Sequence, residues 1–111
     1  MTNILESIQH LFTPVKSLPI GIYHYQAPPD AQVPYRLHLR LEPDGSGILI
    51  VNASTILHLN STASEYAYHL VMQTPEDQLV RAITGRYRVS HQQALMDFQN
   101  LKERIIQIAI P

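Results

Sequence analysis

The chain has 111 residues, of which 45% are hydrophobic, and its eight Lys and Arg residues nearly balance its nine Asp and Glu residues. A chain of this length forms about one domain, and its near-zero net charge argues against nucleic acid as a partner, because phosphate backbones are bound by basic surfaces. The sequence has no cysteine, which excludes disulfides, thiolate nucleophiles and iron–sulfur ligation by these residues.

The first 34 residues predict a short helix followed by a proline-rich arm. Apolar residues from Asn3 to Phe12 fall on one helical stripe, and Asn3 and Glu6 have the spacing of a capping box. From Thr13 to Pro34, prolines recur too often for a long helix or an interior strand. Residues 20–25 have room for one short edge strand, but we interpret the whole segment as an extended arm.

Residues 35–59 predict three short antiparallel strands. Apolar and polar residues alternate from Tyr35 to Glu42, which is the two-residue period of a strand with one solvent-exposed face. A turn at residues 44–47 leads to a second strand at 48–51, and a turn at 52–54 leads to a third strand at 55–59.

Three helices are predicted after the strands, each with its own start signal. Residues 60–62 supply candidate N-caps for the first helix, and Thr62 and Glu65 have the spacing of a capping box. Residues 74–77 place a cap, a proline and two acids at the start of the second helix. The last and longest helix opens with capping-box spacing at residues 90–93. The expected fold class is therefore α+β.

Three short motifs lie in order along the second half of the chain. Residues 59–63 (LNSTA) join the strands to the helices, residues 83–89 (ITGRYRV) close the second helix, and Asp97-Phe98 lies in the third helix. In this order and at these distances the motifs resemble those of the PqqD-like family, also called RiPP recognition elements. The resemblance covers roughly residues 40–106 and does not extend to the N-terminal arm.

The resemblance implies a winged-helix-like peptide-binding domain over residues 35–107, preceded by the helix and arm (1–34) and followed by a tail (108–111). Such modules bind the leader segment of a ribosomally synthesised precursor peptide and present it to a modifying enzyme. That enzyme is often a radical SAM maturase, fused to the module or separate from it. The module itself is not catalytic and has no cofactor.

The resemblance also implies how the leader binds: it pairs with the third strand and lays side chains into a cleft between that strand and the third helix. Edge strands present unpaired N–H and C=O groups, so an extended peptide can satisfy them. The candidate peptide contacts are Thr55, Ile56, Leu57 and His58 on the strand and Leu95, Phe98, Lys102, Ile105 and Ile106 on the helix.

The strand residues allow two interpretations. If Leu57 and Leu59 face the core, the two-residue period turns Ile56 and His58 to the other face. An apolar Ile56 there contacts either the bound peptide or a covering segment, such as the third helix or the N-terminal arm. For His58 we favour a surface histidine without a role.

The third helix has two flanks, and the sequence leaves open which of them meets the third strand. Leu95, Lys102 and Ile106 widen the apolar face on one flank, whereas Asp97 and Arg104 occupy the other. Phe98 and Ile105, which lie between the flanks, also fit the core. We favour the apolar flank as the wall of the cleft.

Neither a metal site nor a catalytic residue is predicted. The six histidines include no pair at metal-ligand spacing on one helix, and no cluster of thiols or carboxylates accompanies them. The sequence also lacks a nucleophile elbow and a phosphate-binding glycine loop.

Two alternatives to peptide capture remain. The first is a winged helix that binds DNA through residues 91–104, with the turn at 44–47 as its wing, but its only basic residues, Lys102 and Arg104, are offset by Asp97 and Glu103. The second is an assembly domain that forms a homodimer by exchange of a strand or of the arm.

The ends of the chain give expectations about its setting. Residues 1–10 lack the basic and apolar segments of a signal peptide, and no apolar run approaches the roughly 20 residues of a membrane helix, so we expect a cytoplasmic protein without a membrane partner. The apolar ending at residues 106–111 is typical of a domain cut from a larger chain.

Overall fold

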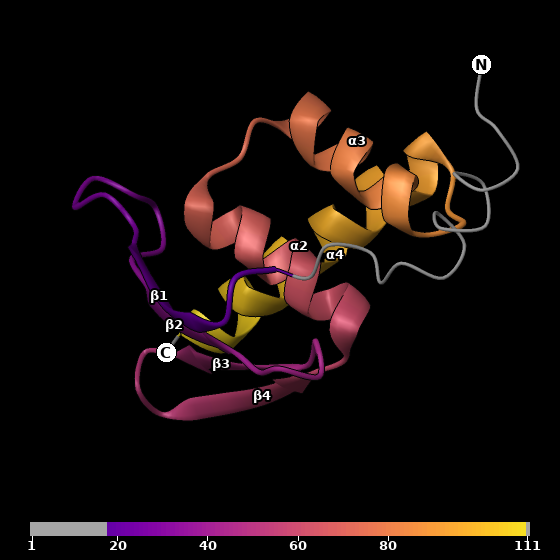
Figure 1. Ribbon diagram of the computed structural model, residues 1–111. Helices are drawn as coiled ribbons and strands as arrows, with labels where there is room; N and C mark the ends of the chain where they lie inside the picture. The colour runs from indigo at the N-terminus through magenta and orange to yellow at the C-terminus, as the bar shows by residue number, and fades with distance from the viewer. Residues whose placement is uncertain (1–17, 111) are drawn as a thin grey trace, which may run out of the picture.

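The computed structural model describes residues 18–110, which form a four-stranded antiparallel sheet with three helices over one of its faces (Figure 1). This arrangement confirms the predicted α+β class. Within residues 18–110, no helix is both long enough and apolar enough to cross a membrane. The strands are β1 (Gly21–Gln26), β2 (Arg36–Leu41), β3 (Gly47–Val51) and β4 (Thr55–Leu59), and the helices are α2 (Ser61–Met72), α3 (Glu76–Arg86) and α4 (His91–Ala109).

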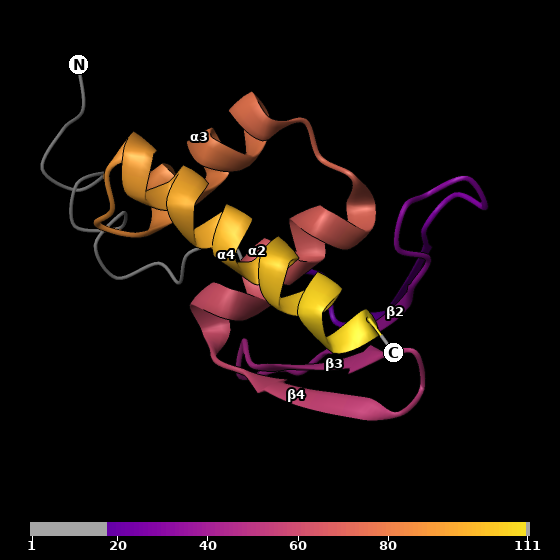
Figure 2. The same cartoon turned by 180° about the vertical axis from the view of Figure 1, so that it is seen from behind.

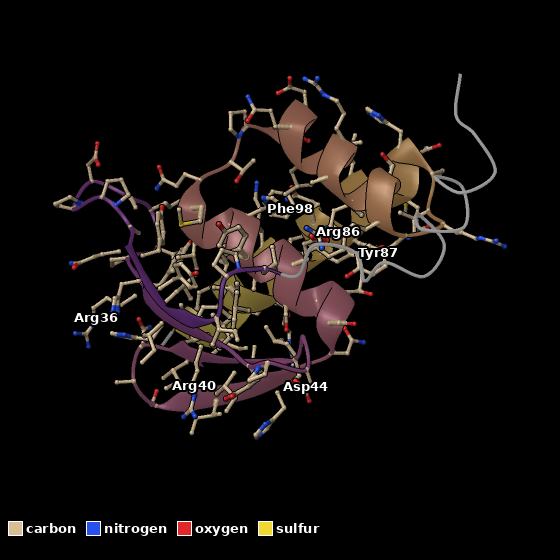
Figure 3. All side chains as sticks on the ribbon, in the orientation of Figure 1. Arg36, Arg40, Asp44, Arg86, Tyr87 and Phe98 are labelled. Carbon is tan, nitrogen blue, oxygen red and sulfur yellow. The ribbon has the colours of Figure 1, made fainter. Side chains whose placement is uncertain are left out.

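The strands lie side by side in the order in which they occur along the chain, β1-β2-β3-β4. In β2, Leu37, Leu39 and Leu41 are buried beneath the helices. Arg36 and Arg40 occupy the alternate positions and extend from the outer face of the sheet, away from the helices (Figure 3). The two-residue period of this segment thus predicted both the strand and its buried face.

One strand comes from the segment that we interpreted as an arm. β1 pairs with β2 along its whole length, so the sheet has one strand more than the three that we predicted, and these residues form the short edge strand that the sequence allowed. The strand contains no proline, and Tyr23 and Tyr25 turn toward the core, which provides the aromatic face that favours a strand. The helix predicted from Asn3 to Phe12 lies outside the described residues.

Both hairpin turns have the residues that the sequence suggested. Between β2 and β3, the Asp44 carboxylate accepts hydrogen bonds from the backbone N–H and the hydroxyl of Ser46, at 2.9 and 2.6 Å. Between β3 and β4, Asn52 and Ala53 both have positive φ, 54° and 64°. Asparagine tolerates this conformation, whereas for alanine it costs about 1–2 kcal/mol.

The first helix after the sheet, α2, begins differently from the prediction. The side chain of Asn60 caps it by accepting a hydrogen bond from the N–H of Ala63, at 2.8 Å. The predicted capping box of Thr62 and Glu65 is wrong, because the Glu65 side chain is buried, 1% exposed, and forms an ion pair instead.

The other two helices differ in how they begin: Ser90 precedes α4, whereas Pro75, which makes no side-chain cap, precedes α3. Ser90 caps α4 as predicted, accepting a hydrogen bond from the N–H of Gln93 at 3.0 Å. Thr74 does not cap α3, because its hydroxyl lies 2.9 Å from Nδ1 of His69 in the preceding helix.

The core consists of two clusters of buried side chains that meet at α2. Leucines of β2 and β3 pack with Ala67 and Val71 of α2 and with Ile105 of α4. On the other side, Tyr66 of α2 packs with residues of α3 and α4. Figure 2, the view from behind, shows α4 crossing in front of α2 and reaching the sheet with its C-terminal end.

Close contact between β3 and α2 depends on a glycine. A Cβ atom at Gly47 would lie 2.7 Å from Oγ of Ser64 and 3.3 Å from the backbone oxygen of Arg40. Neither neighbour leaves room for a side chain, so α2 can lie this near to the sheet only because residue 47 has none.

Candidate functional site

β4 forms one edge of the sheet, since its only strand partner in residues 18–110 is β3. The register shows which of its backbone groups face outward. The N–H of Asn52 donates to the backbone oxygen of Arg36 beside the Val51–Leu37 pair, so Val51 directs its own backbone groups toward Thr55 of β4. Backbone direction alternates along a strand. The N–H and C=O groups of Ile56 and His58 therefore point to the open edge.

The side chains of β4 also alternate. Ile56 and His58 lie on the outer face, and Ile56 is 58% exposed. Leu57 and Leu59 turn toward the core but are only half-buried, unlike Leu49 beside them on β3, which is 0% exposed. The sequence correctly predicted these directions, and within residues 18–110 the alternative that Ile56 is covered by the last helix is wrong.

An apolar patch continues from Ile56 across the outer face. Ile50 of β3 lies directly opposite Ile56, and Ile48 lies opposite His58. Both β3 side chains are partly exposed. Beyond them, β2 adds the cationic Arg36 and Arg40 (Figure 3). A strand added to β4 would extend this apolar patch and bury more of it.

A hollow of about 260 Å³ lies on the inner side, next to the junction of β4 and α2. It opens between the first turns of α2 and the middle of α4. Its lining residues are Asn60, Thr62, Ala63, Tyr66, Asp97, Asn100 and Leu101. The hollow combines small and polar groups with one apolar wall, which is the composition of sites that hold a side chain and fix its orientation.

Asp97, which lines the hollow, contacts Tyr66 within it and Gln93 one turn earlier on α4. The amide nitrogen of Gln93 donates to Asp97 at 2.7 Å, and the Tyr66 hydroxyl lies 3.5 Å from the other Asp97 oxygen. Burial, together with the charge of Asp97, raises the pKa of Tyr66 to about 12. Tyr66 is therefore a neutral hydrogen-bond donor at physiological pH, and at 3.5 Å it is held only loosely.

The flank of α4 that faces the junction of β4 and α2 is the one that carries Asp97, and not the apolar flank that we favoured. Asp97 and Leu101 face the β4–α2 junction across the hollow. Leu95 instead packs against the cluster that α4 forms with α3. The choice of the apolar flank, which included Lys102 and Ile106, as the wall beside the strand is therefore wrong.

The other predicted contacts on α4 serve the core. Phe98 and Ile105 are 8% and 0% exposed and belong to the two core clusters. The Lys102 ammonium lies 5.2 Å from the centre of the Phe98 ring, within the range of a cation–π contact. Phe98 and Ile105 are therefore not accessible to a peptide at β4, whereas Lys102 is partly exposed.

The described part of the predicted arm lies at the other edge of the sheet. β1 pairs with β2 and is separated from β4 by two strands, so residues 18–35 leave the β4 edge open. Whether the first 17 residues cover that edge is a question that falls outside the described residues.

A second cavity, of about 200 Å³, was missed by the sequence analysis. It lies between the start of α2, the end of α3 and the turn after β2, and it contains an ion pair in which Arg86 Nε lies 2.7 Å from a Glu65 oxygen (Figure 3 labels Arg86 and Tyr87). Apart from this ion pair, neither Glu65 oxygen has a hydrogen-bond partner among the described residues. Burial raises the pKa of Glu65, and the Arg86 charge partly offsets this. The sequence could not predict this ion pair, because Glu65 and Arg86 lie on different helices and no regular sequence spacing relates them.

Comparisons of this chain with models of known protein families, with curated protein sequences and with solved structures found no match. The resemblance to the PqqD-like family therefore stays a prediction that rests on the motifs within residues 59–98.

Proposed function

We propose that this chain is a winged-helix-like recognition domain without catalytic activity. It binds an extended peptide, the leader of a ribosomally synthesised precursor, by strand addition to β4, and it presents that peptide to a modifying enzyme such as a radical SAM maturase. The observation that carries the proposal is the open edge of β4, where the N–H and C=O groups of Ile56 and His58 point away from β3.

The geometry of the edge supports strand addition over other modes of peptide binding. Two outward-facing residues offer up to four backbone hydrogen bonds, each with a net contribution of about 0.5–1.5 kcal/mol. Alternate side chains of the peptide would then fall on the two faces of the sheet. Those on the outer face would lie beside Ile56, and those on the inner face would point toward the hollow lined by Ala63 and Asp97.

The test is a titration of the full-length chain with leader peptides encoded next to its gene, followed by amide chemical shifts in NMR spectra. We expect the largest changes at residues 55–58 and at the hollow, in residues 60–66 and 97–101. The Ile56→Asp variant should bind at least about tenfold more weakly, because a charged side chain replaces apolar contact area.

Ile22→Asp is the matched control. Ile22 is 64% exposed on the outer face of β1, so it has the same residue type and a similar exposure at the opposite edge. It should leave peptide binding unchanged. Equal weakening by both substitutions, or wild-type affinity in a folded Ile56→Asp variant, would exclude the β4 edge as the peptide site.

A dimer formed by antiparallel pairing of two β4 strands is the second candidate, since the same unpaired backbone groups and the same exposed Ile56 would serve it. Sedimentation of the chain at increasing concentration separates the two. A dimer that dissociates in the Ile56→Asp variant, together with an absence of peptide binding, would favour assembly.

Binding of DNA through α4 is less well supported. Lys102, one of only two basic residues in the proposed recognition segment, lies over the ring of Phe98. Salt-dependent binding of duplex DNA, without binding of any leader peptide, would overturn the proposal in favour of a DNA-binding domain.

A further inference from the structure

Two histidines from neighbouring strands meet on the outer face of the sheet. His24 of β1 lies directly opposite His38 of β2, and their Nδ1 atoms are 2.6 Å apart. The two rings are nearly perpendicular, at 87°, with their centres 4.5 Å apart. They are 14 residues apart in the sequence, so only the strand register brings them together.

The register also explains why the two rings are so close. The N–H of Ala27 donates to the backbone oxygen of Tyr35, the residue opposite it, which makes that pair a hydrogen-bonded one. Pairs alternate along an antiparallel ladder, so the His24–His38 pair is not hydrogen-bonded through its backbone. Side chains approach each other most closely at such pairs, with Cα atoms about 4.5 Å apart.

Two Nδ1 atoms at this distance cannot both carry a proton. One ring must present a lone pair to something held between the rings, either a single proton on the other nitrogen or a cation that both lone pairs bind. Since neutral imidazole is the nitrogen ligand that Zn²⁺, Cu²⁺ and Ni²⁺ prefer, the arrangement suits a transition metal as well as a shared proton.

We propose that His24 and His38 form a two-ligand site for a divalent transition metal ion, with both Nδ1 atoms as ligands. Zn–N bonds of about 2.0–2.1 Å in tetrahedral geometry place two ligand nitrogens about 3.3 Å apart. The rings would need to separate by about 0.7 Å relative to the structure, which small rotations about their side-chain torsions supply. The ion would connect the edge strand β1 to β2.

The surroundings leave room for the remaining ligands of the ion. A hollow of about 270 Å³ adjoins both rings, together with Gln26 and Arg36. Within residues 18–110, no group of three or more His, Cys, Asp or Glu side chains could hold a metal ion, so water or a group from outside these residues completes the coordination. Such an open site is typical of exchangeable metal binding and differs from closed structural zinc sites.

Nearby charges limit the affinity. Arg36 and Arg40 lie two positions before and after His38 on the same face of β2, and a positive charge opposes a cation. Arg40 is partly neutralised, because its Nε lies 2.9 Å from a Glu42 oxygen. Both arginines would favour an anionic group, such as a carboxylate, among the ligands that complete the site.

The test uses Zn²⁺ as the probe, with Mg²⁺ as a control, because Mg²⁺ prefers oxygen ligands. The full chain is titrated with ZnCl₂ while the imidazole nitrogens are followed in NMR spectra. We expect one ion per chain and shifts at both Nδ1 atoms, with none produced by Mg²⁺. His24→Gln and His38→Gln should each weaken Zn²⁺ binding by about 10–100-fold or more.

His58→Gln is the matched control, since His58 lies on the same outer face but in β4, separated from β1 by two strands. It should bind Zn²⁺ as the wild type does. Thermal unfolding gives a second measurement: Zn²⁺ should raise the melting temperature of the wild type and EDTA should reverse this, with no effect in the double variant.

Three results would overturn the proposal. One is a wild-type protein whose ring nitrogens do not respond to Zn²⁺, which would leave a shared proton as the only bond between the rings. Another is Zn²⁺ binding of equal strength in the wild type and in a folded double variant. The third is a loss of binding in His58→Gln as large as in His24→Gln.

Discussion

The two edge strands of the sheet, β1 and β4, expose similar apolar side chains but differ in the prolines that flank them. Each exposes an isoleucine on the outer face, Ile22 on β1 and Ile56 on β4, at 64% and 58%. However, Pro19 lies two residues before β1 and Pro28 two residues after it, whereas β4 and its flanking turns contain none. Because proline cannot donate a backbone hydrogen bond, it limits the length over which another strand can pair. An exposed apolar residue therefore does not by itself identify an edge that is open for pairing.

The inner sides of the two edges differ as well. Beside β1, Tyr23 packs edge-to-face on Tyr68 of α2, with ring centres 5.3 Å apart, and its hydroxyl donates to the backbone oxygen of Pro19 at 2.7 Å. On β4, Leu57 and Leu59 are only half-buried, and a hollow opens at Asn60, where β4 leads into α2. One edge has its inner face filled by aromatic rings, and the other retains space for a guest side chain.

The largest effect on stability is expected at the Glu65–Arg86 ion pair. This pair lies in the cavity between the start of α2, the end of α3 and the residues before β1. Arg86→Ala should lower the free energy of unfolding by about 3 kcal/mol at pH 7, because it leaves a buried carboxylate without its counter-charge. Urea unfolding measures this. Arg81→Ala is the control, since the Arg81–Asp77 pair is largely exposed and should contribute little.

The loss of stability caused by Arg86→Ala should depend on pH and become smaller in acid. Burial raises the pKa of Glu65 above its usual 4.5, so protonated Glu65 favours the folded state below that pH, and this advantage disappears as the pH rises through the raised pKa. Without Arg86 the pKa rises further. The difference between Arg86→Ala and the wild type should therefore shrink as the pH falls from 7 toward 4.5. A difference that grows on acidification would mean that Glu65 is not the group responsible.

A smaller effect, on peptide binding alone, tests directly whether the two edges of the sheet differ. His58→Pro removes an N–H that points away from the sheet, so the fold should survive while a donor for strand addition is lost. Peptide binding should weaken by about 1–3 kcal/mol, or roughly ten- to a hundredfold. Isothermal titration calorimetry with a leader peptide would measure the change.

Ile22→Pro is the corresponding change at the other edge, because the N–H of Ile22 also points outward in the β1–β2 register. Its affinity for the peptide should match that of the wild type. If the substitution in β1 weakened binding and the one in β4 did not, the assignment of the two edges would have to be exchanged.

The smallest expected effect concerns the turn that leads into β4. Ala53 has a φ of 64°, which glycine adopts without strain. Ala53→Gly should therefore raise the melting temperature, corresponding to a stabilisation of about 1 kcal/mol. Ser54→Gly is a suitable control, since Ser54 is not among the residues with positive φ. No gain in Ala53→Gly would indicate that the turn relaxes in solution.

Local patterns in the sequence predicted much of this fold. Alternation in residues 35–42 identified β2, and the polar residue at Ser90 identified the start of α4. These features depend only on near neighbours in the chain. β1 was allowed as a short edge strand, but the prolines on both sides favoured an extended arm, because its pairing with the distant β2 cannot be seen in the local sequence.

The candidate site was predicted less completely, for a similar reason. The outward direction of Ile56 follows from alternation and was predicted. The flank of α4 that faces the strand depends on how α4 crosses α2, and hydrophobicity pointed to the wrong one because Leu95 serves the contact with α3. Contacts between distant elements, such as Glu65 with Arg86 and His24 with His38, follow only from the tertiary arrangement.

The missing side chain at Gly47 has a consequence for the evolution of this fold. Because a Cβ there would meet Ser64 and the backbone at Arg40, residues 47 and 64 share one small space. Any lineage that retains this packing must keep glycine at the first position, and a larger residue at the second would have to push α2 off the sheet. Homologues too divergent for their surfaces to be compared should still carry this pair of small residues, one at the start of a strand and one in the first turn of the following helix.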